Sequence, residues 1–255
     1  MEQEKQILKL RDKVLVLLKD KVNDFALGGG TALSLFYFHH RESYDLDFFT
    51  KSFSETLIKQ LMKELSSTLG KAIRMLGQME APNKARVIVF EVAGGLKIDF
   101  IEDVFRHFEV KSTVNGIPIL SKESIYIRKI YATCGIAEIQ TSTGHQVFVG
   151  GRHEAKDYLD LYVLSNTFMP LSEFVKRFCD LSEMERVVIW FRRYDRMAMM
   201  SGLMDIRTDR TLDAKIIELG ARPSFPAQVS LDHIAAHYCP EEDDNVILDA
   251  QVCKL

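Results

Sequence analysis

The stretch from Gly28 to Phe49 constrains this chain most, because it combines a glycine turn with a pair of closely spaced acids. The residues before it, Phe25-Ala26-Leu27, are typical of the end of a buried strand. Three glycines follow, and they let the backbone take conformations that a side chain would forbid. Thr31 is predicted to N-cap a short apolar helix over residues 32–38. The free backbone N–H groups at the start of such a helix form a cradle for an anion.

A strand is predicted from Tyr44 to Phe49, and two acids, Asp45 and Asp47, share one of its faces. Neighbouring carboxylates repel each other in a half-buried strand unless a cation lies between them. The pattern therefore predicts a divalent metal site beside the anion cradle, although a solvated strand face accounts for Asp-x-Asp equally well. Before this strand, His39-His40-Arg41 is explained as a group of cations beside the negative end of the helix.

A third acid follows in a segment with strand periodicity. Between residues 71 and 100 the chain alternates apolar and polar residues, interrupted by Pro82-Asn83 and Gly94-Gly95, which predicts several strands with turns between them. In the last of these strands Asp99 points away from the core, so it would join Asp45 and Asp47 if the two strands are neighbours. Taken alone, Asp99 is explained more simply as a plain surface residue.

Composition excludes several classes of protein. Hydrophobic residues make up 47% of the chain and charged residues 27%, which is typical of a globular protein. Its 255 residues are enough for a sizeable core. A net charge of −3 argues against a generally basic nucleic-acid binder. Four cysteines without C-x-x-C spacing predict neither a zinc knuckle nor a disulfide framework. The sequence shows no signal peptide and no membrane-spanning stretch, so we expect a cytoplasmic protein without a membrane partner.

Two lobes are predicted, residues 1–120 and 121–255, because helices dominate after Ser121. Serine caps and glycine stops delimit helices at Ser54 and Gly70 and at Ser121 and Gly135. Further helices are expected over residues 152–164 and, after the capping box Ser182-x-x-Glu185, over residues 187–197. The segment between residues 136 and 151 is expected to form a loop at 141–144 and an extended stretch at 146–149.

The combination of Gly29-Gly30-Thr31, a helix that ends in His-Arg, and Ser43-x-Asp45-Leu46-Asp47-Phe48-Phe49 resembles the AbiEii/AbiGii-type nucleotidyltransferases. These are toxin-like members of the polymerase-beta-like nucleotidyltransferase superfamily. The resemblance implies an α/β (α+β) nucleotidyltransferase lobe with a mixed sheet, followed by a mainly helical C-terminal lobe. It also implies transfer of a nucleoside monophosphate from a nucleoside triphosphate to an acceptor hydroxyl, with two Mg²⁺ (or Mn²⁺) ions held by Asp45, Asp47 and Asp99.

The resemblance extends to residues that would hold the triphosphate. Gly29, Gly30 and Thr31 would bind the outer phosphates through backbone N–H groups and the threonine hydroxyl. In the second lobe, the resemblance carries over a set of charged residues as phosphate contacts or catalytic and site-organising acids: Lys129, Arg152, Lys156, Asp157 and Asp160. From spacing alone, i,i+4 ion pairs are the preferred explanation of the same helical segment, and simple solvation explains Lys129 equally well.

The biological role that the resemblance implies is that of a toxin in a toxin–antitoxin system, with a cognate antitoxin and an RNA acceptor such as a tRNA 3′ end. Two alternatives stay open at the level of the sequence. One is transfer of AMP to a protein side chain or a small molecule. The other is a catalytically silent nucleotidyltransferase fold that serves as a binding module.

Overall fold

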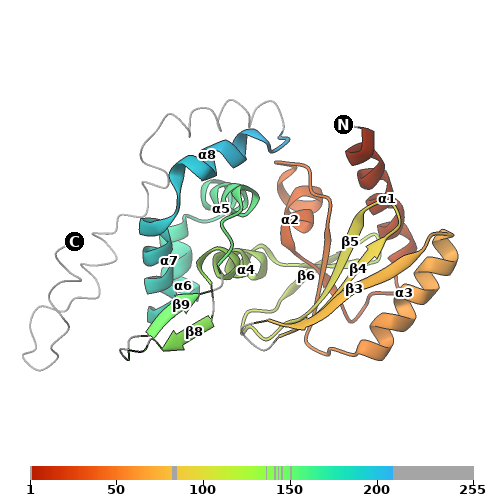
Figure 1. The fold of residues 1–255 in the computed structure, drawn as a ribbon, viewed down its shortest axis with the longest axis horizontal. Helices are drawn as coiled ribbons and strands as arrows, with labels where there is room; N and C mark the ends of the chain where they lie inside the picture. The colour runs from red at the N-terminus through yellow and green to blue at the C-terminus, as the bar shows by residue number, and fades with distance from the viewer. Residues whose placement is uncertain are drawn as a thin grey trace, which may run out of the picture.

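A seven-stranded mixed sheet lies between two groups of helices, with α1 and α3 on one side and α4 to α8 on the other (Figure 1). The computed structural model describes residues 2–81, 85–135, 137–140, 142, 144, 146–149 and 151–208. The described helices are α1 (Glu2–Leu18), α2 (Gly29–Ala32), the π-helix η1 (Leu33–Phe38), α3 (Glu55–Leu69), α4 (Lys122–Cys134), α5 (Ala155–Thr167), α6 (Leu171–Phe178), α7 (Leu181–Arg193) and α8 (Arg196–Met204). The described strands are β1 (Ala26–Leu27), β2 (Leu46–Thr50), β3 (Ile73–Glu80), β4 (Arg86–Val92), β5 (Leu96–Glu102), β6 (Val110–Val114), β7 (Ile117–Leu120), β8 (Ala137–Gln140) and β9 (Gln146–Val149).

Strand β2 lies at the centre of the sheet, whose order is β3-β4-β5-β2-β1-β7-β6. It runs parallel to β5 and antiparallel to β1, whereas β1 runs parallel to β7. The remaining pairs, β3 with β4, β4 with β5 and β6 with β7, are antiparallel hairpins. The predicted mixed sheet is therefore confirmed, and the predicted acid-bearing strand has a neighbour on each side.

Alternation along β2 and β5 divides the sheet into an apolar face and a polar face. Leu46, Phe48, Ile98 and Phe100 are fully buried, and the rings of Phe48 and Phe100 stack with their centroids 5.6 Å apart. Buried apolar residues of α1 and α3 join them in one core. The intervening residues of both strands consequently point to the other side of the sheet, where they line a cleft with α4.

Four helix ends lie where the sequence predicts them. The hydroxyl groups of Ser54 and Ser121 cap α3 and α4, and Gly70 and Gly135, both with positive φ, end the same two helices. Each cap accepts a backbone N–H that would otherwise have no partner in the first turn. These helix ends are set by local chemistry, which explains why they could be read from the sequence.

The capping box of α7 lies two residues before the predicted one. The Asp180 carboxylate accepts from the Glu183 N–H at 3.0 Å, and the Glu183 side chain accepts from the Asp180 N–H at 2.7 Å. The prediction of Ser182 and Glu185 is wrong because the sequence contains two overlapping boxes and aspartate caps as well as serine does. Helix α5 likewise begins at Ala155, later than predicted.

Strands β8 and β9 pair as a hairpin in the segment between α4 and α5. Strand β9 confirms the predicted extended stretch, whereas β8 is an additional strand, and Thr141 and Thr143 of the predicted loop lie outside the described residues. Strand β7 ends at Leu120 and α4 begins at Lys122, and the division into two lobes at this point stays a prediction. Residues 209–255 of the predicted second lobe also lie outside the described residues. Of the helices that are described, none combines the length and apolar character needed to cross a membrane.

Candidate active site

The glycine turn brings the backbone directly against the acid-bearing strand. Gly28 is the N-cap of α2, and its N–H donates to the carbonyl oxygen of Asp47 at 2.9 Å. Gly29 has a φ of +63°, and a Cβ at this position would overlap Oδ2 of Asp47. Glycine is therefore required at position 29 both for its left-handed backbone and for the space that the Asp47 carboxylate fills.

Gly30 makes room for a different side chain. A Cβ at this position would overlap Nη2 of Arg41 and would lie 3.3 Å from Oδ2 of Asp160. The second glycine thus admits an arginine to the start of α2. The predicted role of the Gly29 and Gly30 N–H groups as phosphate donors stays a prediction.

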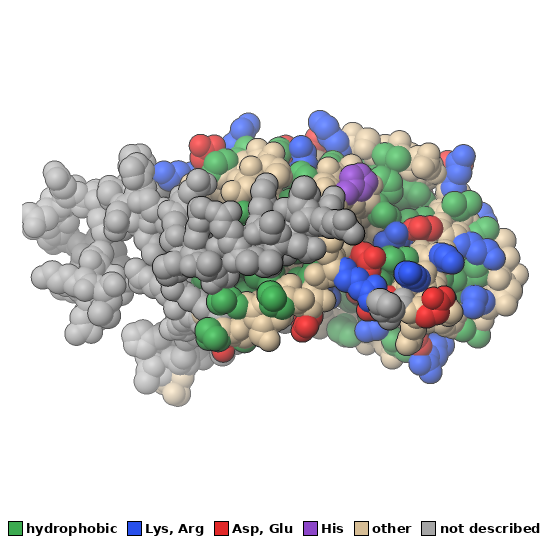
Figure 2. Space-filling view, turned by 90° about the horizontal axis from the view of Figure 1, so that it is seen from above, with side chains coloured by type: hydrophobic (Ala, Val, Ile, Leu, Met, Phe, Trp, Pro, Cys, Tyr) green, Lys and Arg blue, Asp and Glu red, His purple; other side chains and the backbone are tan. Residues whose placement is uncertain are grey.

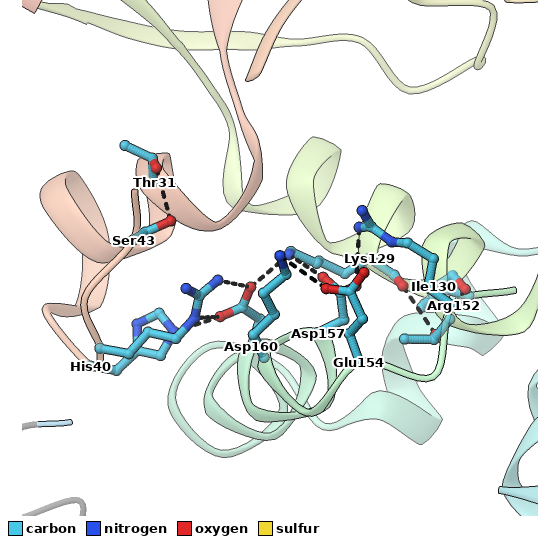
Figure 3. Close-up of polar contacts among 12 residues, drawn as sticks. Thr31, His40, Ser43, Lys129, Ile130, Arg152, Glu154, Asp157 and Asp160 are labelled. Atoms are coloured by element: carbon cyan, nitrogen blue, oxygen red, sulfur yellow. Dashed lines mark hydrogen bonds and ion pairs between the residues drawn. The ribbon is translucent and has the colours of Figure 1, made fainter. Parts of the chain in front are cut away.

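Thr31 lies inside α2 rather than at its N-cap, which corrects the expectation from the sequence. The side chain is fully buried, and its hydroxyl is hydrogen bonded to the Ser43 hydroxyl at 2.8 Å (Figure 3) and to the Asp45 carbonyl oxygen. The hydroxyl is thus already engaged within the protein, and the predicted phosphate contact of Thr31 stays a prediction. Thr31 fixes the chain that leads into β2.

Asp47 and Asp99 lie directly opposite each other in the parallel register of β2 and β5. The two backbones are about 4.8 Å apart in such a pair. Both acids project from the face opposite to Phe48 and Phe100, as alternation along the strands requires. Asp45 lies one residue before β2, close enough for its charge to act on the other two acids. The neighbouring strands that the sequence analysis required for Asp99 are therefore present.

Burial and mutual repulsion oppose ionisation of these carboxyl groups. Burial raises the pKa of Asp99 to about 7, and the charges of Asp47 and Asp45 contribute to the rise. Burial also raises the pKa of Asp47, although the nearby Lys129 ammonium opposes it. Oδ1 of Asp99 is buried and has no hydrogen-bond partner within the described part of the chain. A cation bound between Asp47 and Asp99 would offset their repulsion and give this oxygen a partner.

A buried group of opposite charges lies across the cleft on α4 and α5 (Figure 3). Nζ of Lys129 lies 2.6 Å from a carboxylate oxygen of Asp157 and 2.6 Å from one of Asp160. Both acids are fully buried, and the lysine is only 6% exposed. Arg152 reaches Asp157 at 3.0 Å from its own half-exposed position. The spacing-based alternative of i,i+4 pairs within one helix is wrong for these two acids, because their partners come from other segments.

Asp160 also connects the two halves of the molecule. Its Oδ1 lies 2.7 Å from Nε of Arg41 and 2.7 Å from Nε2 of His40, and its Oδ2 accepts from Nη2 of Arg41 at 2.8 Å. Burial opposes the charge of Asp160, but Lys129 and Arg41 hold the pKa of this carboxyl well below its usual range. His40 and Arg41 therefore pair with α5, and the expectation that they compensate a helix end is wrong.

The acids and the cations line a shared cleft of about 290 Å³. Asp47 and Asp99 contribute from the sheet, and Lys129 and Arg152 contribute from α4 and the segment before α5. Lys156 is half exposed, and its Nζ lies 2.9 Å from Oε2 of Glu154, while its charge reaches Asp47. Three cations and two acids thus act on one another across a space that an anionic ligand can enter.

The donor set suits Mg²⁺ only in part. Mg²⁺ is typically bound by one or two carboxylates together with substrate phosphates and water, and Asp47 and Asp99 match that requirement, since Oδ1 of Asp99 has no partner among the described residues. Within the described residues, no group of three His, Cys, Asp or Glu side chains stands ready to hold a metal ion. The two carboxylates therefore match the ligands of an ion that arrives with a nucleotide.

Comparison with known families decides the class of the protein. The sequence profile of the family described as "Nucleotidyl transferase AbiEii toxin, Type IV TA system" matches residues 16–186. The chain belongs to this family. The match spans the glycine turn, the three acids and the Lys129–Asp160 cluster, so the resemblance predicted from the sequence is confirmed and the protein is a nucleotidyltransferase of the AbiEii family.

Other comparisons are more distant or more local. JHP933 from Helicobacter pylori is 19% identical with a TM-score of 0.49, over 85% of this chain and 89% of that one. The Megavirus polyadenylate synthase is 18% identical with a TM-score of 0.42, over 65% of this chain and 32% of that one. A methionine aminopeptidase of Pyrococcus horikoshii is 46% identical over 37 residues, which are 14% of this chain. The chain spans 12% of the length of that curated relative.

Replacement of Gly29 tests the packing of this AbiEii motif against Asp47. Gly29→Ala is expected to lower nucleotidyl transfer by about 100-fold, because the methyl group must displace the Asp47 carboxylate and shifts near 1 Å have effects of that size. Gly70→Ala is the matched control, since Gly70 has the same left-handed φ but no atom of the described residues within 4 Å of the new Cβ. This control variant is expected to lose about 1 kcal/mol of stability and to keep wild-type transfer activity. Equal activity of the two variants in a transfer assay would contradict the packing argument.

Proposed function

We propose that this AbiEii-family nucleotidyltransferase transfers a nucleoside monophosphate from a nucleoside triphosphate to a hydroxyl group of RNA and acts as the toxin of a toxin–antitoxin pair. The observation that carries the proposal is the direct pairing of Asp47 with Asp99 in a cleft whose opposite wall is cationic. Acids on one side and cations on the other match the needs of a metal–triphosphate complex. The alternative of a silent fold has no such requirement for paired buried acids.

Each wall of the cleft has a separate task in the proposed reaction. Asp47 and Asp99 would hold Mg²⁺, with Asp45 adding negative charge at the edge of the pair. When bound, the metal supplies Lewis-acid stabilisation of charge on the phosphate oxygens. Asp99 would also help to deprotonate the attacking hydroxyl, as a base or through the metal that it holds.

The opposite wall would orient the triphosphate. Arg152 and Lys156 are half exposed and can turn toward phosphate oxygens, whereas Lys129 is fixed by two acids. Burial opposes the charge of Lys129, but Asp160 and Asp157 raise its pKa, so it stays protonated and supplies a fixed positive charge. Of the three predicted phosphate-binding cations, Arg152 and Lys156 can therefore adjust to the ligand, whereas Lys129 stays in a fixed position.

An RNA acceptor fits the charge distribution only locally. Lysine and arginine side chains alternate with acidic ones over the sheet half of the face shown in Figure 2, in keeping with the net charge of −3. Attraction of RNA would then come from the cations at the cleft mouth, such as Arg152 and Lys156, rather than from a broad basic surface. The cognate antitoxin would limit this activity in the cell.

Labelled nucleoside triphosphates, Mg²⁺ and total RNA, incubated with the full chain, test the proposal. We expect label in RNA with the wild type and at least about 100-fold less with Asp47→Asn, which keeps the size of the side chain and removes its charge. Asp24→Asn, at an exposed turn position, is the control and should transfer normally. Label found only in protein, or equal transfer by Asp47→Asn, would overturn the proposal.

A further inference from the structure

The loop between η1 and β2 leads to Asp45, and it is held by a side chain that comes from α1. Arg11 donates from Nη1 to the carbonyl oxygen of Ser43 at 2.6 Å, across 32 positions of the chain. Nε and Nη2 of the same guanidinium donate to Oδ1 of Asp12 at 2.9 Å and 2.7 Å. The guanidinium is thus fixed by its neighbour on α1 while it reaches the loop.

Burial distinguishes Arg11 from the other polar residues of α1. The buried residues of this helix are Leu10, Arg11, Val14 and Leu18, and the three apolar ones belong to the core. Arg11 is only 6% exposed, and a buried guanidinium is costly unless hydrogen bonds replace its water. The Ser43 carbonyl oxygen supplies such a bond. Arg11 also lies before residue 16, where the family match begins, so its role must be inferred from its own contacts.

Hydrogen bonds continue from the Ser43 residue to Asp45. The Ser43 hydroxyl is bonded to the Thr31 hydroxyl at 2.8 Å, and the Thr31 hydroxyl is also bonded to the carbonyl oxygen of Asp45. Ser43 and Thr31 are both buried, so these contacts extend the path from α1 through the protein interior. The path ends at Asp45, whose charge acts on both Asp47 and Asp99.

We infer that Arg11 is a positioning residue of the active site, which holds Asp45 in place for a metal–triphosphate complex. The inference rests on the proposed function, because it takes the acids as the metal-binding wall of the cleft. Arg11 acts through the loop and does not touch the ligand. Helix α1 lies on the side of the sheet opposite to α4 and α5 (Figure 1), and Arg11 is not among the described residues that line the cleft. Replacement of a residue that orients a metal ligand typically costs about 10- to 100-fold in metal affinity.

The Mg²⁺ requirement of Arg11 variants tests the inference. Arg11→Gln removes the charged donor to the Ser43 carbonyl oxygen, whereas Arg11→Lys keeps one, and a single bond to a carbonyl does not need the guanidinium fork. Thr31→Val preserves the shape of its side chain and removes the hydroxyl that is bonded to Ser43 and Asp45. Val14→Ala is the matched control, because it removes fully buried apolar atoms from α1 but no hydrogen bond to the loop.

Binding of inorganic tripolyphosphate to the full chain is measured by calorimetry at a series of Mg²⁺ concentrations, and transfer of label to RNA is measured over the same series. Thermal unfolding in EDTA gives the stability of each variant. We expect Arg11→Gln and Thr31→Val to raise the half-saturating Mg²⁺ concentration about 10-fold in both assays, with kcat recovered at saturating Mg²⁺. Arg11→Lys should stay within about 3-fold of the wild type. Val14→Ala should unfold at a lower temperature with an unchanged Mg²⁺ requirement.

An unchanged Mg²⁺ requirement in Arg11→Gln and Thr31→Val, together with a loss of stability like that of Val14→Ala, would show a structural role alone and overturn the inference. A wild type that binds tripolyphosphate with Mg²⁺ but transfers no label to RNA would refute the proposed function, and the binding data would still decide the role of Arg11. A wild type without Mg²⁺-dependent binding would refute both.

Discussion

Asp160→Asn is expected to lower the free energy of unfolding by about 3–5 kcal/mol, the range found when one partner of a buried ion pair is removed. The substitution preserves the volume of the side chain but leaves Arg41 and Lys129 buried with one carboxylate fewer. Because Asp160 is fully buried, water cannot replace the lost interactions. Chemical denaturation of the wild type and the variant measures the difference.

Ionisation of Asp160 itself adds no pH dependence to this loss between about pH 5 and 8. The pKa of Asp160 lies well below its usual range, so its contribution is present above the unfolded pKa and disappears only as the pH falls through the lower folded value. The same substitution is expected to weaken nucleotide binding, because Lys129 loses one of the two carboxylates that hold it beside Asp47. The loss of stability and the weaker nucleotide binding therefore both follow from removal of the Asp160 charge.

Glu154→Gln provides the control in the same segment. Glu154 pairs with Lys156 in solvent, with both side chains more than 40% exposed, and such surface pairs contribute at most about 1 kcal/mol. A double-mutant cycle of Arg41→Gln and Asp160→Asn should give a coupling energy of about 1–3 kcal/mol. If Asp160→Asn were no more costly than Glu154→Gln, the buried connection between the loop after η1 and α5 would not exist in solution.

Local chemistry explains which parts of this protein could be predicted from its sequence. Glycine, serine caps and alternating apolar residues act within a few positions of the chain, so the glycine turn, the caps of α3 and α4, and the strands that carry Asp47 and Asp99 follow from sequence patterns. The family resemblance supplied the connection between these local features and the cluster on α5.

Most of the wrong predictions from the sequence concern residues whose partners are far away in the chain. Arg41 and Asp160 are separated by 119 positions, and nothing near Arg41 indicates that its partner is a carboxylate on α5. Thr31 likewise bonds to Ser43 and Asp45 rather than to its own helix. In the sequence, a hydroxyl or a cation beside a helix end is most simply interpreted as a cap of that helix. The distant partner that it contacts instead is known only from the tertiary structure.

The side chains that pack against Gly29 and Gly30 explain why both positions are glycine. The sequence indicates that Gly29 and Gly30 permit a turn and a close approach to an anion. In the structure, the space beside them is filled by the protein itself, by the Asp47 carboxylate and the Arg41 guanidinium. The glycine motif therefore aligns the acidic and basic walls of the cleft, in addition to any contact with phosphate.

Asp99→Asn is expected to make the metal-free protein more stable at pH 8 by about 1–3 kcal/mol while it lowers transfer by at least about 100-fold. Ionised Asp99 is unfavourable in the fold, because it is partly buried beside Asp47 and one of its oxygens has no partner among the described residues. Asparagine removes the charge without changing the size of the side chain. The opposite signs of the two effects separate a catalytic acid from one that holds the fold together.

The pH dependence of this stability difference has a defined sign. The folded pKa of Asp99, about 7, lies above the unfolded value, so the folded protein binds the proton more tightly between about pH 4 and 7. Its stability consequently falls across that interval, as the unfolded chain releases the proton, and the effect of Asp99 is constant above about pH 7. The advantage of Asp99→Asn should be absent near pH 4, grow as the pH rises and level off above pH 7.

Thermal unfolding in EDTA across pH 4–8 measures this profile, with Asp24→Asn as a control for the loss of one exposed carboxylate. Addition of Mg²⁺ and a nucleoside triphosphate should stabilise the wild type more than Asp99→Asn, since a cation between Asp47 and Asp99 offsets their repulsion and lowers the pKa of Asp99. A variant less stable than the wild type at pH 8 would show that Asp99 has a stabilising partner. Asp99 would then be a structural residue, and the acid pair would lose the electrostatic conflict that a bound metal resolves.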